Sequence, residues 1–286
     1  MASLIRVENL HYTYHAEGAH GPEGGIVALR GVDVELAEGQ HLAVVGRNGS
    51  GKSTLAKCLN ALLIPTQGDV WIMAHNTRER AARLEIRAAI GMVFQNPENQ
   101  FVTTSIEEEV AFGPENLGIP HPELRRRVDA ALERVALDVP RDRDPRYLSA
   151  GQKAKLAIAA ALAMEPRCLI LDEATAMLDP LAREQVIETV GALQEQGMTL
   201  VNVTHFMEEA ALADRVLVLA QGRVAALDAP GAIFAQGDLC RDAGLHLPMP
   251  TRIAQGLATR GLALPTPILH ENDLVRACLA CRERAR

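Results

Sequence analysis

One run of eight residues constrains the fold of this chain more than any other feature of its sequence. Residues 46–53 read GRNGSGKS, which satisfies the pattern GxxxxGK(S/T). The run follows a short apolar stretch at residues 42–45 and precedes a helix-compatible stretch at residues 53–63. Glycines let backbone N–H groups turn inward around phosphate oxygens, and the following helix presents its positive end to them. The sequence therefore predicts a strand, a phosphate-binding loop and a helix.

The side chains of this loop have expected roles in binding a nucleotide. Lys52 supplies a positive charge to the β- and γ-phosphates, and Ser53 supplies a hydroxyl ligand to Mg²⁺. A glycine-rich turn without function is the alternative, and the flanking strand and helix argue against it. The predicted phosphate-binding set is Gly46, Asn48, Gly49, Ser50, Gly51, Lys52, Ser53 and Thr54.

A second apolar strand, predicted at residues 168–171, leads into two carboxylates, Asp172 and Glu173. If this strand runs parallel to the one before the loop, Asp172 arrives beside Ser53, where a carboxylate holds Mg²⁺ directly or through water. Glu173 lies one residue further and is placed to polarise an attacking water as a general base. These residues together predict hydrolysis of ATP or GTP.

The remaining pattern alternates strands and helices. Residues 4–8 and 32–36 alternate apolar and charged side chains, which is typical of half-exposed antiparallel strands, and residues 17–25 are typical of a loop. A helix at 181–196 and strands at 199–203 and 216–219 imply a mainly parallel sheet covered by helices. Residues 122–146 predict one solvated amphipathic helix. Beyond Gly237, we expect short helical pieces interrupted by prolines.

Composition and charge exclude several classes of protein. The net charge of −7 disfavours a non-specific grip on nucleic acid, so no nucleic-acid partner is expected. The longest uncharged apolar run, residues 156–164, has nine residues, whereas a membrane-spanning helix needs about 20. No secretory signal is recognisable, so a cytoplasmic protein is expected. Cys278 and Cys281 form one CxxC pattern without a second pair, and we expect two ordinary thiols there.

Five further features surround the phosphate-binding loop. LSAGQ at residues 148–152 precedes a predicted helix, and MLDP occupies residues 177–180. Gln95 follows a strand-like stretch, His205 ends another, and Tyr14 lies upstream of the loop. In order and approximate spacing, these features resemble the nucleotide-binding subunit of ATP-binding cassette (ABC) transporters across residues 4 to about 235.

The resemblance implies that ATP is sandwiched between two such subunits. Ser149, Gly151 and Gln152 would then reach the γ-phosphate held by the other subunit, and Asp179 would couple the two sites. It further implies that Gln95 touches the metal ion and the water, that His205 contacts the γ-phosphate beside Glu173, and that Tyr14 stacks on adenine.

Two of these residues are ambiguous when taken singly, and two positions depart from the family pattern. Alone, His205 would more often be a core or strand-end histidine and Tyr14 a surface aromatic, so only the ensemble favours the functional interpretation. Ala150 stands at the third position of the family's common LSGGQ, where glycine is usual, and alanine narrows the accessible backbone angles. Lys155 stands where arginine is frequent, which keeps the charge but loses a fork of donors.

Residues 94–120 and 171–180 closely resemble the ATPase subunits of energy-coupling factor (ECF) importers, which take up vitamins and transition-metal ions. The resemblance implies three partners: a second ABC ATPase, either a paralogue or a second copy, a transmembrane scaffold and a substrate-binding membrane component. It also implies a peripheral location at the cytoplasmic face of the cell membrane. Within residues 94–120, the side chains that could be contact or core are Phe101, Val102, Ile106, Val110 and Phe112.

The expected fold is therefore an α/β P-loop NTPase of the ABC ATPase type. Residues 1–237 would form the nucleotide-binding domain, with an N-terminal antiparallel β subdomain and a helical signature subdomain at about 97–165. Residues 238–286 would form a small C-terminal extension that contributes to dimerisation. An ATPase of another ABC importer class is one alternative. A soluble ABC ATPase acting on DNA or ribosomes is a second, disfavoured by the single phosphate loop, the lack of sustained heptads and the acidic charge.

Overall fold

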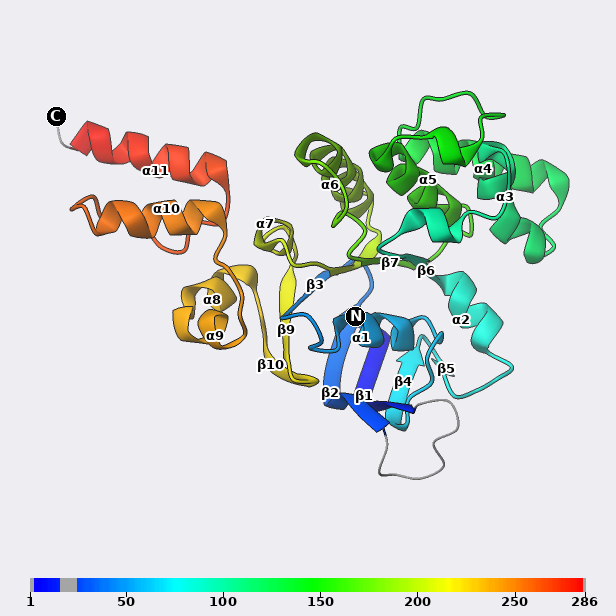
Figure 1. Ribbon diagram of the computed structural model, residues 1–286, viewed down its shortest axis with the longest axis horizontal. Helices are drawn as coiled ribbons and strands as arrows, with labels where there is room; N and C mark the ends of the chain where they lie inside the picture. The colour runs from blue at the N-terminus through cyan, green and yellow to red at the C-terminus, as the bar shows by residue number, and fades with distance from the viewer. Residues whose placement is uncertain (1–2, 16–24, 285–286) are drawn as a thin grey trace.

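The computed structural model describes residues 3–15 and 25–284 and contains two sheets (Figure 1). The first is antiparallel, with the strand order β2-β1-β4-β5. Its strands are β1 (Ser3–His15), β2 (Gly25–Ala37), β4 (Gln67–Ile72) and β5 (His75–Asn76). Burial alternates along β2 between Val32 and Leu36, which confirms the expected half-exposed strand. Most of the loop predicted at residues 17–25 lies outside the described residues.

The second sheet has the strand order β10-β9-β3-β8-β7-β6, and all of its pairings are parallel except that of β10 with β9. Its strands are β3 (His41–Val45), β6 (Ile90–Val93), β7 (Cys168–Asp172), β8 (Thr199–Val203), β9 (Arg215–Ala220) and β10 (Arg223–Asp228). Every residue of β3, β7 and β8 is buried, because helices and the first sheet cover both faces. The predicted parallel sheet is confirmed.

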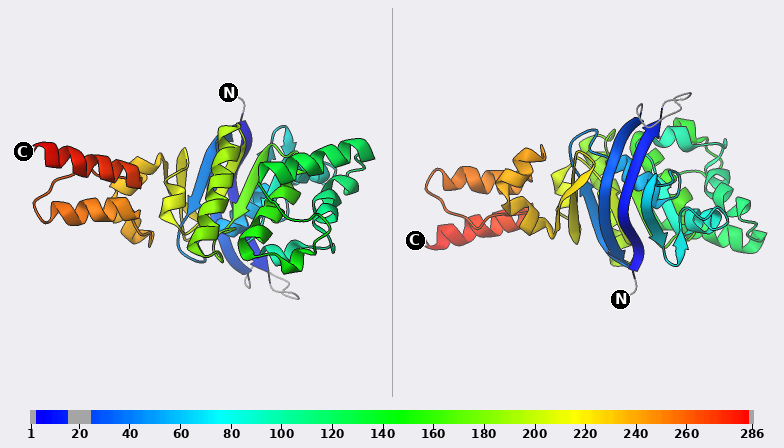
Figure 2. Two further views of the ribbon diagram at one scale, coloured as in Figure 1. Left: turned by 90° about the horizontal axis from the view of Figure 1, so that it is seen from above. Right: turned by 90° about the horizontal axis from the view of Figure 1, so that it is seen from below.

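The helix α1 (Lys52–Leu59) packs between the two sheets. It is shorter than the stretch predicted to be helical, because Asn60 ends it and Ala61 takes a left-handed conformation. The opposite face of the parallel sheet is covered by helices, and those of residues 106–162 gather at one end of the molecule (Figure 2). The covering helices are α3 (Ile106–Asn116), α4 (His121–Arg134), α5 (Ala150–Leu162) and α6 (Pro180–Glu195). The short helix α2 (Arg83–Ala89) precedes β6.

The prediction of one helix over residues 122–146 is wrong in its second half. The helix α4 ends at Arg134, and Ala136 takes a left-handed backbone conformation with φ 48°. The amide of Leu137 then donates to the carbonyl of Leu132, which closes the helix end. The following residues form a loop and a short 3₁₀ helix, Pro145–Tyr147.

The C-terminal part of the chain forms two groups of helices. The short helices α7 (Met207–Ala210), α8 (Pro230–Ala235) and α9 (Gly237–Asp242) pack on the sheet around Phe234. The helices α10 (Met249–Ala258) and α11 (Glu271–Arg284) form a hairpin with a small core of its own, and we call it the C-terminal arm. Figure 2 shows this arm projecting away from the body, at the end opposite α3 and α4. The domain boundary predicted after Gly237 stays a prediction. The helix α9 begins at Gly237 and shares a hydrophobic cluster with α8.

Candidate functional site

The loop of residues 46–51 connects β3 to α1 and depends on two glycines for its shape. Gly46 has φ 151° and Gly51 has φ 106°. A Cβ atom on Gly46 would lie 2.2 Å from the carbonyl oxygen of Leu219, and one on Gly51 would lie 2.7 Å from that of Ala28. Only glycine fits positions that combine such backbone angles with such close approach, so the loop is fixed by its neighbours.

Lys52 lies at the start of α1 with 5% of its side chain exposed. Its Nζ donates to the carbonyl of Gly46 at 3.0 Å and lies 3.6 Å from Oε1 of Glu173. The ammonium group is thus held inside the loop and beside the carboxylate that follows β7. A phosphate group entering the loop would meet a positioned positive charge.

Ser53 and Asp172 meet as the sequence predicts. The Oγ of Ser53 donates to Oδ1 of Asp172 at 2.7 Å, although β8 lies between the strands β3 and β7. Burial raises the pKa of the Asp172 carboxyl above its ordinary value, and the Ser53 hydrogen bond and the nearby Lys57 and Lys52 oppose that rise. A hydroxyl and a buried carboxylate are the hard oxygen ligands that Mg²⁺ prefers, with its other positions left for water and phosphate. These two residues therefore fit a magnesium ion.

Glu173 has a backbone conformation unusual for a residue with a side chain. Its φ is 54°, in the left-handed region, which costs about 1 kcal/mol for a residue other than glycine. Its amide donates to the carbonyl of Val203 at 2.9 Å, which extends the pairing of β7 with β8 by one residue. Strain of this kind persists only where the surrounding structure holds it, and it is concentrated at functional sites.

A cleft of about 460 Å³ brings most of the predicted nucleotide-binding residues together. Its lining residues are Tyr14, Ile26, Val27, Ala28, Asn48, Gly49, Gly51, Lys52, Ser53, Thr54, Gln95 and Glu173. Tyr14 lies at the end of β1, and its hydroxyl is 3.1 Å from that of Thr54. Residues 26–28 of β2 were not predicted. The pairing of Tyr14 with Ile26 brings them to the cleft, and a hairpin register drawn across the loop could have found them.

The other predicted residues lie outside the lining of this cleft. Ser149 caps α5: its Oγ accepts from the amide of Gln152, and the Gln152 side chain accepts from the amide of Ser149. Asp179 caps α6 by accepting from the amide of Ala182. Gly151 is buried, and a Cβ there would lie 3.0 Å from the Cβ of Ala182. Ser149 and Asp179 are exposed.

His205 also lies outside the lining of the cleft. It is exposed and follows β8, the neighbour of β7, so it lies at the same edge of the sheet as Glu173. Its ring contacts that of Phe206, with the ring centroids 4.1 Å apart.

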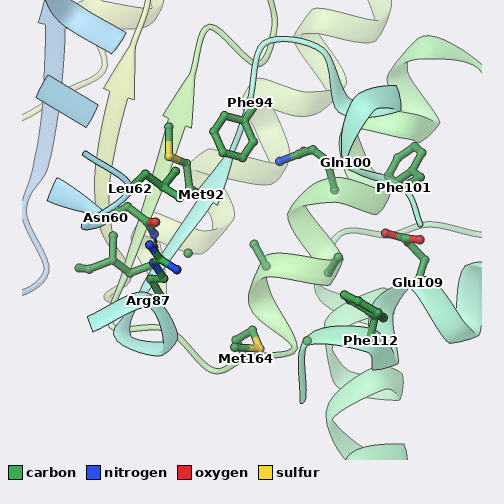
Figure 3. A pocket seen from close by; sticks show the side chains of 16 residues that line it. Asn60, Leu62, Arg87, Met92, Phe94, Gln100, Phe101, Glu109, Phe112 and Met164 are labelled. Carbon is green, nitrogen blue, oxygen red and sulfur yellow. Dashed lines mark hydrogen bonds between the residues drawn. The ribbon is translucent and has the colours of Figure 1, made fainter. Parts of the chain in front are cut away.

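A separate groove of about 300 Å³ lies between the sheet and the helical region (Figure 3). Leu62 and Met92 lie on one side of it, and Phe101 and Phe112 lie on the other. The structure divides the five side chains whose role the sequence left open. Ile106 and Val110 are core, Phe101 is half-buried in the groove, and Val102 and Phe112 are exposed.

Comparison with known proteins places the chain in a family. Residues 29–176 match the model of the ABC transporter family. The chain is 50% identical over 274 residues to the energy-coupling factor transporter ATP-binding protein EcfA1 of Symbiobacterium thermophilum, an alignment that covers 96% of each chain. The chain belongs to the ATP-binding subunits of energy-coupling factor transporters. As a member of this ABC ATPase family it binds and hydrolyses ATP.

Solved structures agree with this membership in an ECF subunit family. The structure of cbiO1 from Clostridium perfringens, described as part of the ABC transporter complex cbiONQ, matches with a TM-score of 0.75 and 34% identity. The alignment covers 90% of this chain and 100% of the cbiO1 chain. The ATP-binding cassette MJ0796, in a dimeric state bound to ADP and Pi, matches with a TM-score of 0.69 and 30% identity over 79% of this chain and 98% of that one. The ABC ATPase fold is therefore confirmed.

Two further observations concern membranes and thiols. Among the described residues, no helix combines the length and apolar character needed to cross a bilayer. Cys278 and Cys281 lie on α11 and are half-buried. Within residues 3–15 and 25–284, no group of three or more His, Cys, Asp or Glu side chains is arranged to hold a metal ion.

Proposed function

We propose that this ECF subunit hydrolyses ATP in the cleft between β1, β2 and the phosphate-binding loop, and that hydrolysis there drives import of a vitamin or a transition-metal ion. The observation that carries the proposal is the arrangement at one edge of the sheet. Lys52 lies 3.6 Å from Glu173, and Ser53 donates to Asp172 at 2.7 Å. Charge for phosphate, ligands for a metal ion and a candidate base thus converge at this edge of the sheet.

In this proposal each side chain has one task. Tyr14 stacks on adenine, the loop amides and Lys52 hold the phosphates, and Ser53, Asp172 and Gln95 hold Mg²⁺. When bound, Mg²⁺ neutralises charge on the phosphate oxygens. Glu173 accepts a proton from the attacking water, because its carboxylate lies beside the loop that would hold the γ-phosphate. His205, at the same sheet edge, contacts that phosphate.

The second half of the site comes from another cassette. Ser149 and the first amides of α5 form an exposed anion site at a helix N-terminus, outside the cleft of their own chain. We call residues 148–152 the signature loop. Exposed apolar side chains flank this surface: Tyr147 before the signature loop, and Met177 and Leu181 on either side of Asp179. Such a surface, apolar with a polar centre, is typical of an interface. We infer that it meets the phosphate-binding loop of a second copy or a paralogue.

Two other surfaces fit the remaining partners. The groove with Phe101 and Phe112 presents apolar side chains that a helix of a transmembrane scaffold can cover, and this contact would hold the subunit peripherally at the cytoplasmic face of the membrane. The C-terminal arm presents Met249 and Ile253 on α10 and Val275 and Leu279 on α11. We infer that these exposed apolar side chains contribute to dimerisation of the two cassettes through residues 238–286. The transported solute would contact a separate membrane component.

Affinity purification from native membranes, with this chain as bait, tests the proposal. The proteins that copurify in amounts equal to the bait are identified. The expected result is a second ATPase, or an equal second copy, together with a scaffold and a small membrane protein whose identity names the solute. Recovery of soluble partners alone would contradict the import function. Copurification of this chain with the membrane subunits of an importer that uses a separate soluble binding protein would assign it to another ABC class.

A further inference from the structure

Two irregular segments carry the side chains to which we assign hydrolysis. Residues 173–179 follow β7 and include Glu173 and Asp179, and residues 204–206 follow β8 and include His205. Within the first segment, the amide of Ala176 donates to the carbonyl of Glu173 at 3.0 Å, and the amide of Leu178 donates to that of Thr175 at 3.1 Å. The amide of Glu173 also donates to the carbonyl of Val203 on β8, which fixes the start of the segment. Beyond that bond, side chains connect the segment to its neighbour.

Glu209, on α7, makes one such connection. Its side chain is 3% exposed. Its Oε1 accepts from Oγ1 of Thr175 at 2.6 Å, and its Oε2 accepts from Nδ2 of Asn202 at 3.2 Å. Thr175 lies two residues after Glu173, and Asn202 lies on β8, three residues before His205. One buried carboxylate thus joins the segment after β7, the strand β8 and the helix that follows His205.

Arg183, on α6, makes a second connection. Its Nη2 donates to the carbonyl of Leu178 at 3.2 Å, and its guanidinium lies 3.6 Å from the centroid of the Phe206 ring. Leu178 directly precedes Asp179, and Phe206 directly follows His205. Hydrogen bonding and a cation–π contact therefore link the far end of the first segment to the second.

The chemistry of Glu209 indicates that stability alone does not explain it. Both donors that it meets are neutral, and burying a carboxylate held by neutral donors costs free energy that an apolar side chain at the same place would not. The carboxylate instead fixes relative position, because its two acceptor oxygens hold the segment of Thr175 and the strand of Asn202 in one register.

We propose that Glu209 is a positioning residue for ATP hydrolysis, which holds Glu173 and His205 in register through Thr175 and Asn202, with Arg183 as a second tie. Misplacing a reacting group by about 1 Å costs up to about 10²-fold in rate. The inference rests on the roles proposed above for Glu173 and His205. It adds that the geometry of these two groups is set by a residue that touches neither the nucleotide nor the metal ion.

Kinetics of the purified transporter complex test this inference with Thr175→Val and Glu209→Gln. Thr175→Val removes the hydroxyl that donates to Glu209, and Glu209→Gln leaves one acceptor oxygen for the two donors Thr175 and Asn202. Each change therefore breaks at least one hydrogen bond of this cluster, and both leave the phosphate-binding loop intact. We expect kcat to fall about tenfold or more, with the Kd for ATP within about twofold of the wild-type value. Because Thr175→Val removes only one hydroxyl group, it remains informative if Glu209→Gln does not fold. Thr175→Ser keeps the hydroxyl and is expected to restore kcat to within about threefold.

Matched changes elsewhere provide the controls. Glu188→Gln makes the same chemical change on the exposed face of α6, and Thr189→Val removes a buried hydroxyl that bonds only within α6. Both controls are expected to keep the wild-type kcat. The double variant Thr175→Val, Glu209→Gln is expected to lose less kcat than the two single losses combined, because both changes act on the contact between Thr175 and Glu209.

Either of two results would overturn the inference: wild-type kcat in folded Thr175→Val, or a loss of kcat that Thr175→Ser does not restore. Glu173→Gln, measured in the same assay, separates this failure from failure of the proposed function. If Glu173→Gln hydrolyses ATP normally, the assignment of the base is wrong. If it is inactive while Thr175→Val is fully active, only the positioning role fails.

Discussion

The phosphate-binding loop and the signature loop are built in opposite ways. The phosphate-binding loop exposes residues 47–49 at its tip, but the side chains of Lys52 at its end and of Asp172 beside it are each 5% exposed. The signature loop is an exposed helix start, where Ser149 and Gln152 exchange two hydrogen bonds between their side chains and backbone amides. In the proposed function, the first surface offers charge and metal ligands to a nucleotide bound by its own chain. The second faces the outside of the molecule and would meet a phosphate held by a second cassette.

This difference in burial predicts a difference in what substitutions disturb. Changes in the phosphate-binding loop and at Asp172 should act on binding or chemistry within one chain. Changes in the exposed loop leave the nucleotide site of their own chain intact and act on its neighbour.

The largest effect is expected from Glu173→Gln. Because the amide cannot accept the proton of the attacking water, turnover should fall by about 10²-fold or more, while ATP binding is retained. Turnover under saturating ATP and equilibrium binding of ATP measure the two separately. Lys52→Ala serves as the contrast, because it removes the buried charge and should weaken ATP binding itself. Normal turnover in Glu173→Gln would remove this residue from the role of base.

A smaller effect is expected from Ser149→Ala. The exposed hydroxyl would lose its contact with the γ-phosphate held by the neighbouring cassette, so turnover should fall about tenfold while the Kd for ATP stays unchanged. Ser105→Ala is the matched control, since Ser105 caps α3 through the amide of Glu108 in the same way. Each loss of a cap should cost about 1 kcal/mol of stability. Equal turnover in the two variants would argue against a signature role for Ser149.

The smallest effect concerns stability. Burial raises the pKa of Asp172 above its ordinary value of 3.8, so the folded protein binds this proton more tightly than the unfolded chain. Below that ordinary value the carboxyl group favours folding, and this advantage is lost as the pH rises through the raised pKa. The metal-free variant Asp172→Asn should therefore gain thermal stability over the wild type as the pH rises. The measurement is the melting temperature of Asp172→Asn minus that of the wild type, at about pH 4 and at about pH 7. A difference that becomes smaller toward neutral pH would contradict the expected sign.

The sequence was sufficient for the parallel sheet and for the contact of Ser53 with Asp172. Both follow from local patterns: apolar runs such as residues 168–171, and motif residues that end parallel strands at one edge. The end of α4 was missed because Ala136 in a left-handed conformation, with φ 48°, leaves no signal in a helical pattern. Alanine has the highest intrinsic helix propensity of all residues, so the pattern favoured a continuing helix.

The connections around Glu209 could not be predicted for a different reason. Thr175, Asn202 and Glu209 lie on three elements, and their meeting depends on how α7 packs against β8. In the sequence, Glu209 is one of two adjacent acidic residues at the start of a short helix, a pattern typical of an exposed first turn. Only its burial shows that it differs from Glu208, which accepts from the amide of Met249 at the base of the C-terminal arm.

Hydrogen exchange of backbone amides tests most directly whether a second cassette completes the site. The experiment uses the complex purified from membranes with Glu173→Gln, which holds ATP without turning it over, and compares exchange with and without ATP. ATP is predicted to slow exchange in two places: at residues 46–54, and at residues 149–153, where the exposed start of α5 would be covered by the neighbouring nucleotide. Protection at residues 46–54 with unchanged exchange at residues 149–153 would contradict the account.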